Sequence, residues 1–235
     1  MDFKFLLPCF FVLMFLVTTD GNAQSNQRVP ITPERMFVPE AFLESEPVTI
    51  FIEGYLPNSC YSLESPEIGI NNQSGVLEVR LVASLNDLRA DYICTQRIVP
   101  FSKEINIGHL LPGEYTIHNP ESEQSFEIEV TNDSHLDQKL AAVDQASLTW
   151  EGHTIQLLGN FLDSCQTWGK TQTQLNGNVV TVLPLVNNGT RENCADSITP
   201  FDFIFAVEHD FEPGQRYLVH VKSSADKAIN FVVQK

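Results

Sequence analysis

Four cysteines in this chain recur at matched positions, and cysteine side chains are suited to only a few kinds of chemistry. Cys60 ends the heptapeptide GYLPNSC and Cys165 ends GNFLDSC, while Cys94 and Cys194 follow each at a similar distance. Such thiols could form disulfides, bind zinc or act as nucleophiles. Zinc sites use close pairs such as Cys-x-x-Cys, which the sequence lacks. A catalytic thiol gives no reason for a second cysteine in each copy, so structural disulfides are favoured.

Four cysteines permit three pairings. Because Cys60 is equivalent to Cys165 and Cys94 to Cys194, a duplicated unit with its own bridge predicts Cys60–Cys94 and Cys165–Cys194. Each bridge closes a loop for which the chain-entropy model gives about 3–4 kcal/mol of stabilisation. The fifth cysteine, Cys9, lies in the N-terminal apolar run and is expected to be removed with it.

The cysteines belong to a longer internal repeat. Each copy contains an apolar strand ending in glycine, the heptapeptide cysteine, a second apolar strand, the second cysteine, a Pro-Phe pair and a Pro-Gly turn. The offset is 105 positions between Gly54 and Gly159, and 100 positions between Pro100 and Pro200. Six landmarks in one order at nearly constant offset indicate duplication of one supersecondary unit.

The elements that must position these cysteines are β-strands. Apolar residues alternate with polar ones in short runs, as at Phe126, Ile128 and Val130, a pattern typical of half-buried strands. Runs about every ten residues predict an all-β protein with two tandem antiparallel β-sandwich domains, each of about seven strands with its own core and disulfide. The predicted segments are a signal peptide (1–23), a lead-in (24–45), a first domain (46–130), a linker with a short helical turn near 140–143 (131–147), and a second domain (148–235).

The N-terminus predicts export. A short charged start precedes an apolar run from Phe5 to Val17, and Gly21 and Ala23 suit cleavage after Ala23. A membrane anchor would need about 20 apolar residues, and no later run could span a bilayer, so we expect a soluble, secreted or periplasmic product. Removal of 1–23 changes the formal net charge from −16 to about −15. Such an acidic protein is a poor partner for nucleic acid or anionic membranes.

The stretch FEPGQRYLVHV at 211–221 resembles the end of a fibronectin type III or related immunoglobulin-like sandwich, where a Pro-Gly turn and a tyrosine begin a late strand. The resemblance implies that Tyr217, and Tyr115 in the similar LLPGEYTI, hydrogen-bond to backbone upstream and close a corner between sheets. It covers about a tenth of the chain, and transthyretin-like sandwiches share the pattern. The cysteines lie closer together than in immunoglobulin domains and Leu63 stands where the second copy has Trp168, so we expect the disulfide at a loop.

Other polar residues do not form a recognisable catalytic or metal site. His118 and His220 each follow a tyrosine by three, which on a strand places them on the opposite face, so we expect them at solvent or the rim. Acidic groups at 44–47, 121–124 and 208–212 lack the spacing of calcium loops and suit solvated faces. Serine hydrolase, zinc protease and P-loop motifs are absent from the sequence. We therefore predict no enzyme activity, no cofactor and no metal.

Trp168 and Lys170 are candidate ligand contacts, because an exposed aromatic among adaptable polar side chains suits recognition. Packing of Trp168 on its own disulfide is the favoured alternative. Three Asn-x-Ser/Thr sequons, at Asn72, Asn132 and Asn188, predict glycosylated surface loops in a eukaryotic host and polar turns in a bacterium.

These observations predict an exported binding protein that contacts an unknown protein or glycan partner through loops at one end of each domain. Two linked modules raise the effective concentration for a repeated partner. One alternative is a secreted inhibitor, in which a single disulfide-pinned loop beside Cys60 or Cys165 blocks a protease or glycosidase. Another is an enzyme with an inter-domain site, where His, Asp or Glu side chains from both copies converge with shifted pKa values.

Overall fold

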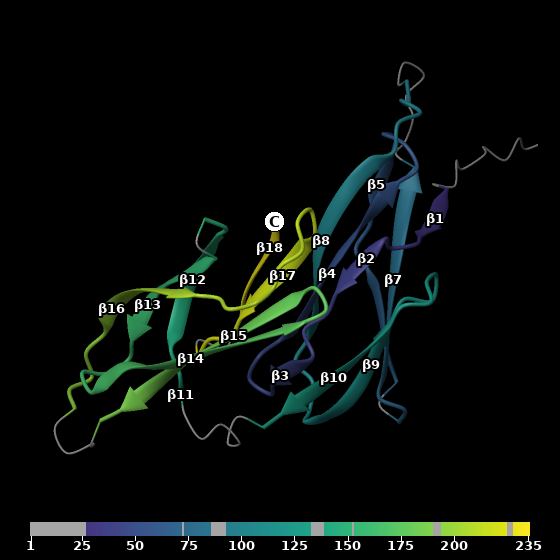
Figure 1. Cartoon of the computed structure of the whole chain (residues 1–235). Helices are drawn as coiled ribbons and strands as arrows, with labels where there is room; N and C mark the ends of the chain where they lie inside the picture. Colours follow the sequence, from purple (N-terminus) through teal and green to yellow (C-terminus); the bar gives the residue numbers. More distant parts are fainter. Residues whose placement is uncertain are drawn as a thin grey trace, which may run out of the picture.

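A computed structural model describes residues 27–71, 73–85, 93–132, 139–151, 153–189, 194–224 and 228–235. Within these ranges every regular element is a β-strand (Figure 1), which confirms the predicted all-β fold. The helical turn predicted near 140–143 is wrong, because strands occupy that stretch. The described residues contain no helix with the length and apolarity needed to cross a membrane. The predicted signal peptide and Asn72 lie outside the described residues.

The first domain is a sandwich of a large and a small sheet. Its lead-in, 24–45, contributes strands to both sheets and is therefore part of the sandwich. The large sheet has the order β1 (Arg28–Ile31), β7 (Val76–Leu85), β9 (Gly113–His118), β10 (Ser125–Thr131) and β3 (Ala41–Leu43), with β5 (Tyr61–Leu63) and β6 (Glu67–Asn71) also paired to β7. The small sheet consists of β2 (Arg35–Phe37), β4 (Val48–Leu56) and β8 (Val99–Gly108).

The second domain has the same two-sheet construction. Its large sheet has the order β11 (Lys139–Leu140), β15 (Val179–Asn188), β17 (Arg216–Val221) and β18 (Ile229–Gln234), with β14 (Gln166–Asn176) also paired to β15. Its small sheet consists of β12 (Ala142–Thr149), β13 (Thr154–Phe161) and β16 (Thr199–Ala206). β11 and most of β12 fall in the stretch for which the sequence predicts a linker, so part of that stretch belongs to the second sandwich.

The two domains repeat one topology. Most strand pairs are antiparallel, but β7 and β9 are parallel, as are β15 and β17. In each case the intervening strand, β8 or β16, lies in the small sheet. Two crossings of the sandwich return the chain in its original direction, which explains why these neighbours are parallel. The short β3 also runs parallel to β10.

Each domain has its own apolar core, and smaller clusters join the two. One core is built mainly from β4, β7 and β10, and the other mainly from β13, β15 and β17. Between them, Phe37 packs against Val179 and Leu218. A second cluster at this boundary contains Leu43, Leu140 and Leu185. Residues far apart in the sequence thus share a buried interface.

A glycine stands opposite a phenylalanine at the same point in both domains. Gly54 pairs with Phe101 and Gly159 with Phe201. A Cβ at Gly54 would lie 2.9 Å from Phe101 Cζ, and one at Gly159 would lie 2.7 Å from Phe201 Cζ and overlap the carbonyl oxygen of Ala142. The heptapeptide therefore begins with glycine because an aromatic ring lies directly over the backbone.

We expect Gly159→Ala to lower the free energy of unfolding by about 1–3 kcal/mol, the usual cost of forcing an extra carbon into a packed core. Chemical denaturation followed by circular dichroism measures this loss. Gly69→Ala is the matched control, because a Cβ there has Glu78 Cβ at 3.8 Å as its nearest neighbour. A Gly159→Ala protein as stable as the Gly69→Ala protein would contradict the close approach of Phe201.

Candidate functional site

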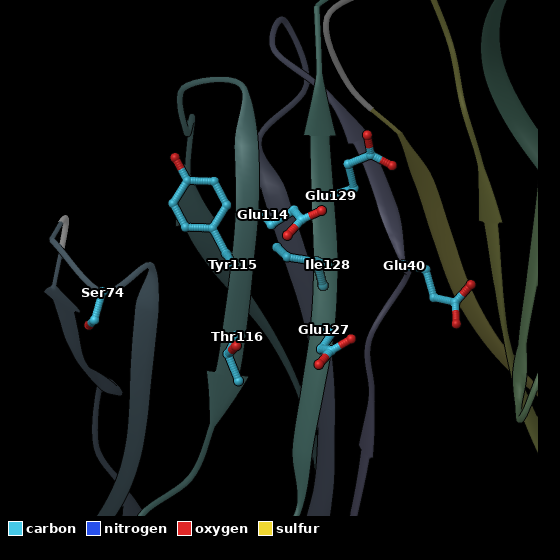
Figure 2. A pocket seen from close by; sticks show the side chains of 8 residues that line it. All are labelled: Glu40, Ser74, Glu114, Tyr115, Thr116, Glu127, Ile128 and Glu129. Carbon is cyan, nitrogen blue, oxygen red and sulfur yellow. The ribbon is translucent and has the colours of Figure 1, made fainter.

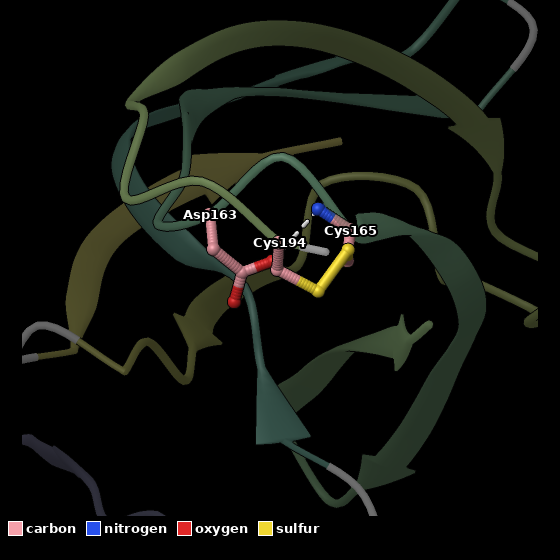
Figure 3. Close-up of side chains that lie close together, drawn as sticks. All are labelled: Asp163, Cys165 and Cys194. Carbon is pink, nitrogen blue, oxygen red and sulfur yellow. Dashed lines mark hydrogen bonds between the residues drawn. A yellow bond between two sulfur atoms is a disulfide. The ribbon is translucent and has the colours of Figure 1, made fainter. Parts of the chain in front are cut away.

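Both heptapeptides build the same turn before their cysteine. Asn58 Oδ1 accepts a hydrogen bond from the Cys60 N–H at 2.9 Å. Asp163 Oδ1 accepts one from the Cys165 N–H, also at 2.9 Å (Figure 3). Asn and Asp are interchangeable here because each offers a side-chain oxygen that closes an Asx turn.

The serine of each heptapeptide ties this turn to the segment after the second cysteine. Ser59 Oγ accepts the N–H of Thr95 at 3.0 Å. Ser164 Oγ accepts the N–H of Ala195 at 2.9 Å, and the Ser164 N–H donates to the Ala195 carbonyl at 3.0 Å. The last three residues of the heptapeptide therefore act as a clasp between two loop segments.

The disulfides Cys60–Cys94 and Cys165–Cys194 join the same segments, which confirms both predicted pairings. Asp163 lies close enough to the second bridge for one oxygen and two sulfurs to sit within 4.8 Å of one another (Figure 3). A disulfide sulfur has lost the thiolate charge that binds a metal. This group therefore fits a covalent clasp and does not fit a metal ion.

Each clasp supports an exposed apolar surface. We call residues 55–60 with 93–98 the first tip, and residues 160–165 with 194–198 the second tip. Ile98 and Ile198 hold equivalent positions, directly before β8 and β16, and are 60% and 73% exposed. Ile93 adds to the first tip and Leu162 to the second. Figure 1 places the tips at opposite ends of the molecule, one beside β5 and the other at the start of β16.

Trp168 lies at the edge between the two sheets of the second domain. Its ring stacks on the Phe203 ring of β16 with the ring centroids 4.0 Å apart. It also meets the Phe201 ring edge-on, with the centroids 5.1 Å apart. Its Nε1 donates to Thr171 Oγ1 at 3.2 Å. Trp168 is half-buried and Lys170 is exposed on the same strand. The ligand-contact role of both residues stays a prediction.

The two tyrosines fix the turns that precede their strands. Tyr115 Oη donates to the carbonyl of Leu111 at 2.8 Å. Tyr217 Oη accepts the N–H of Glu212, also at 2.8 Å. Each hydroxyl thus binds backbone four or five residues upstream, and the contacts are structural.

Two of the three sequon asparagines lie on the surface. Asn132 follows β10 and Asn188 ends β15, and both are exposed. Their modification stays a prediction.

His220 is completely buried, so the expectation that it faces solvent or the rim is wrong. β17 carries Tyr217 into the second core, while its opposite face packs on the first domain. His220 Nε2 lies 3.0 Å from Glu46 Oε1, and its ring meets Phe42 edge-on with centroids 5.6 Å apart. Lys222 Nζ lies 3.7 Å from Glu46 Oε2. The expectation failed because the first domain covers the face of β17 that would otherwise be solvated.

Glu46, His220 and Lys222 bring ionisable side chains from both copies together, as an inter-domain enzyme site requires. Their exposed fractions are only 4%, 0% and 4%. His220 Nδ1 lies 2.8 Å from Asn230 Oδ1, so both ring nitrogens face oxygen atoms. A substrate has no access to groups this deeply buried, and the arrangement therefore suits a structural ion cluster.

The surroundings of Glu46 decide its charge state. Burial by itself would raise the pKa of Glu46, but His220, Lys222 and the N–H of Leu43 favour the carboxylate and hold the pKa below 4.5. A carboxyl group with a lowered folded-state pKa stabilises the fold above its unfolded value, and this contribution is lost as the pH falls through the folded value. The contact between the domains therefore weakens in acid, below pH 4.5.

The expectation that the acidic group at 44–47 lies on a solvated face is wrong for Glu46, which is buried. Sequence reasoning also missed Lys222, although one signal was present. The strand RYLVHV has apolar or aromatic residues on both faces, a pattern typical of strands buried on both sides. That pattern predicts a second layer over β17, but it does not say which residues come with that layer.

One cleft in the first domain is strongly acidic. It has a volume of about 450 Å³ and lies on β9 and β10, where Glu40, Glu114, Glu127 and Glu129 line it with Tyr115 (Figure 2). Glu114 and Glu129 are direct cross-strand neighbours, an arrangement in which like charges repel. All four glutamates are exposed, so they form a solvated acidic face.

Residues 50–135 match the model of a family described as the ORF11 beta-sandwich domain. The match spans most of the first domain and agrees with the sandwich found there. No curated protein and no solved structure matches the chain. The resemblance to fibronectin type III and immunoglobulin-like domains therefore stays a prediction.

We expect Glu46→Gln to lower the free energy of unfolding by about 3–5 kcal/mol at neutral pH, because buried Lys222 loses its counter-charge. The variant should also lose part of the wild-type decrease in stability below pH 4.5. Thermal unfolding between pH 3 and pH 7 measures both effects. Glu123→Gln, at an exposed position, is the control and should follow the wild type. Parallel pH profiles for Glu46→Gln and wild type would contradict the assignment.

Proposed function

We propose that this protein is a secreted, non-enzymatic binding protein whose two tips contact partner proteins. The observation that carries the proposal is the exposure of Ile98 and Ile198 at equivalent, clasped positions. Single exposed apolar residues are common on protein surfaces, but groups of them mark interaction sites. Ile93 and Leu162 extend the apolar surface of each tip.

The construction of the tips supports recognition. A disulfide, an Asx turn and a serine hydrogen bond hold each loop before any partner arrives. Little conformational entropy is then lost on binding, which favours affinity. Aliphatic side chains bury well against another protein, whereas they offer no hydrogen bonds to the hydroxyl groups of a glycan. A protein partner is therefore favoured.

The positions of the tips support a bridging role. Because they lie at opposite ends of the molecule (Figure 1), they reach two partners, or two distant sites on one partner. Simultaneous engagement raises the overall affinity through effective concentration. The buried contact between the domains keeps the tips apart.

Export is supported by two features. Disulfides persist in oxidising compartments, and the chain has two of them. The N-terminal sequence has the charged start, apolar run and small residues of a signal peptide. Mass spectrometry of the secreted protein would test the expected cleavage after Ala23.

The double variant Ile98→Asn/Ile198→Asn tests the proposal. Immobilised wild type should capture specific proteins from the exported fraction of its own source, and these should be identified by mass spectrometry. A central apolar contact contributes about 2 kcal/mol or more, so in the double variant the attachment at each tip should weaken roughly thirtyfold. Each single variant should retain one of the two attachments.

Leu111→Asn is the matched control, because Leu111 is 74% exposed and lies outside both tips. This variant should capture the same proteins as wild type. Capture that survives in the double variant, or that fails equally in Leu111→Asn, would show that the tips are not the contact surface.

A further inference from the structure

β16 is an edge strand whose outer side is unpaired among the described residues: it pairs with β13 alone. The Val207 N–H donates a hydrogen bond to the His153 carbonyl, just beyond the last pair of the β13–β16 ladder. Val207 and His153 therefore form a hydrogen-bonded pair. Because such pairs alternate along antiparallel strands, the backbone N–H and C=O groups of Asp202 and Ile204 point away from β13. The backbone of Pro200 points away from β13 in the same way, but proline has no N–H group, so it adds no unpaired donor to this edge.

The inward side of β16 carries an aromatic row. Phe201, Phe203 and Phe205 alternate along the strand, and all three remain half-buried instead of fully buried. Trp168 stacks on Phe203 from the opposite sheet. A strand added to β16 would extend this partly exposed apolar surface with its own inward side chains.

The equivalent strand of the first domain shows that this edge is unusual. The matching registers of Gly54 with Phe101 and Gly159 with Phe201 make β8 the counterpart of β16. β8 carries Lys103 and Glu104 where β16 carries Phe203 and Ile204. Charges on edge strands prevent pairing with other chains. β8 carries a charge at both positions and β16 at neither, so Asp202, where β8 has Ser102, is the one charged side chain along β16.

The outward side of β16 combines an apolar side chain with acidic groups. Ile204 is 59% exposed. Asp202 and Asp144 line a cleft of about 550 Å³ on the same face, together with the amide side chains of Gln145 and Asn160. A strand lying beside β16 would place its outward side chains next to Asp202, where a basic group is favoured, whereas Asp144 lies on β12 at the far side of β13 and adds to the acidic field of this face.

We propose that β16 binds an extended peptide segment of a partner protein by β-strand addition, and that this segment is apolar on one face and basic on the other. Backbone hydrogen bonds from Asp202 and Ile204 supply affinity, and the two faces of the strand supply specificity. A second copy of this chain is a poorer occupant, because each copy carries a formal net charge of −16. The surface adjoins the second tip, since Asn160 lines its cleft and Ile198 directly precedes β16, but the backbone groups that bind the peptide belong to β16 itself.

A labelled octapeptide of alternating lysine and valine is a suitable probe, and its fluorescence anisotropy measures binding to the disulfide-intact protein. A peptide of the same composition with four lysines followed by four valines controls for attraction to an acidic protein. We expect the alternating peptide to bind at least about tenfold more tightly, because only it can present one apolar face along a strand.

Ile204→Pro separates backbone pairing from side-chain contact. The substitution removes an N–H that points away from β13, so the internal ladder is kept while the added strand is blocked. We expect affinity for the alternating peptide to fall at least about tenfold, the effect of one lost hydrogen bond and a steric clash. Ile204→Ala keeps the N–H and should bind within about threefold of wild type.

A second variant covers the case in which Ile204→Pro does not fold. Phe203→Lys copies the residue that β8 carries at this position, in a strand that is stable in the same sandwich, and should also abolish binding because it places a charge against the apolar face of the peptide. Equal affinities for the two peptides, or for wild type and both edge variants, would overturn the proposal. A wild-type dimer that Ile204→Pro dissociates would also overturn it, because the occupant would then be a second copy. Loss of the tip isoleucines should leave peptide affinity unchanged, so the two proposals fail independently.

Discussion

The arrangement of this molecule depends on the burial of β17 between two layers. One face of the strand completes the core of the second domain and the other lies against the first domain, where Glu46 meets His220 and Lys222. An ion cluster taken out of water adds little net stability, but removing one member leaves a buried charge unpaired. The cluster therefore specifies one way for the domains to meet. Apolar contacts such as Phe37 with Leu218 provide the area that holds them together.

The same contact gives a physical use to the duplication. Two copies of a sandwich joined without a fixed contact would present their tips in many relative directions. With β17 buried on both faces, the tips project from opposite ends (Figure 1). The separation of the tips is then a property of the fold. The acidic face around Glu114 and Glu129 and the apolar edge of β16 are held in the same frame.

Divergence between the copies is concentrated at their edges. The clasp is retained, since Asn58 and Asp163 both close an Asx turn and Ser59 and Ser164 both bind across it. Backbone geometry demands these residue types, so they change little. The backbone of an edge strand does not require a particular side chain at these positions, and Lys103 in one copy corresponds to Phe203 in the other. Differences at positions that the fold does not restrict are where separate binding properties can arise.

The sequence by itself determined the β class, the repeat and both disulfide pairings, because period-two alternation, matched landmarks and cysteine positions are local or pairwise properties of the chain. It also located the glycines of the heptapeptides, although only the structure explained them by the rings of Phe101 and Phe201. It misplaced His220 and missed the strand character of residues 139–147, since both depend on what packs against them. Only the tertiary structure decided which face of β17 is covered, where the tips lie and which edge is unprotected. Those features arise from contacts between residues far apart in the sequence, such as Glu46 with His220 and Leu157 with Phe203, and no local pattern records them.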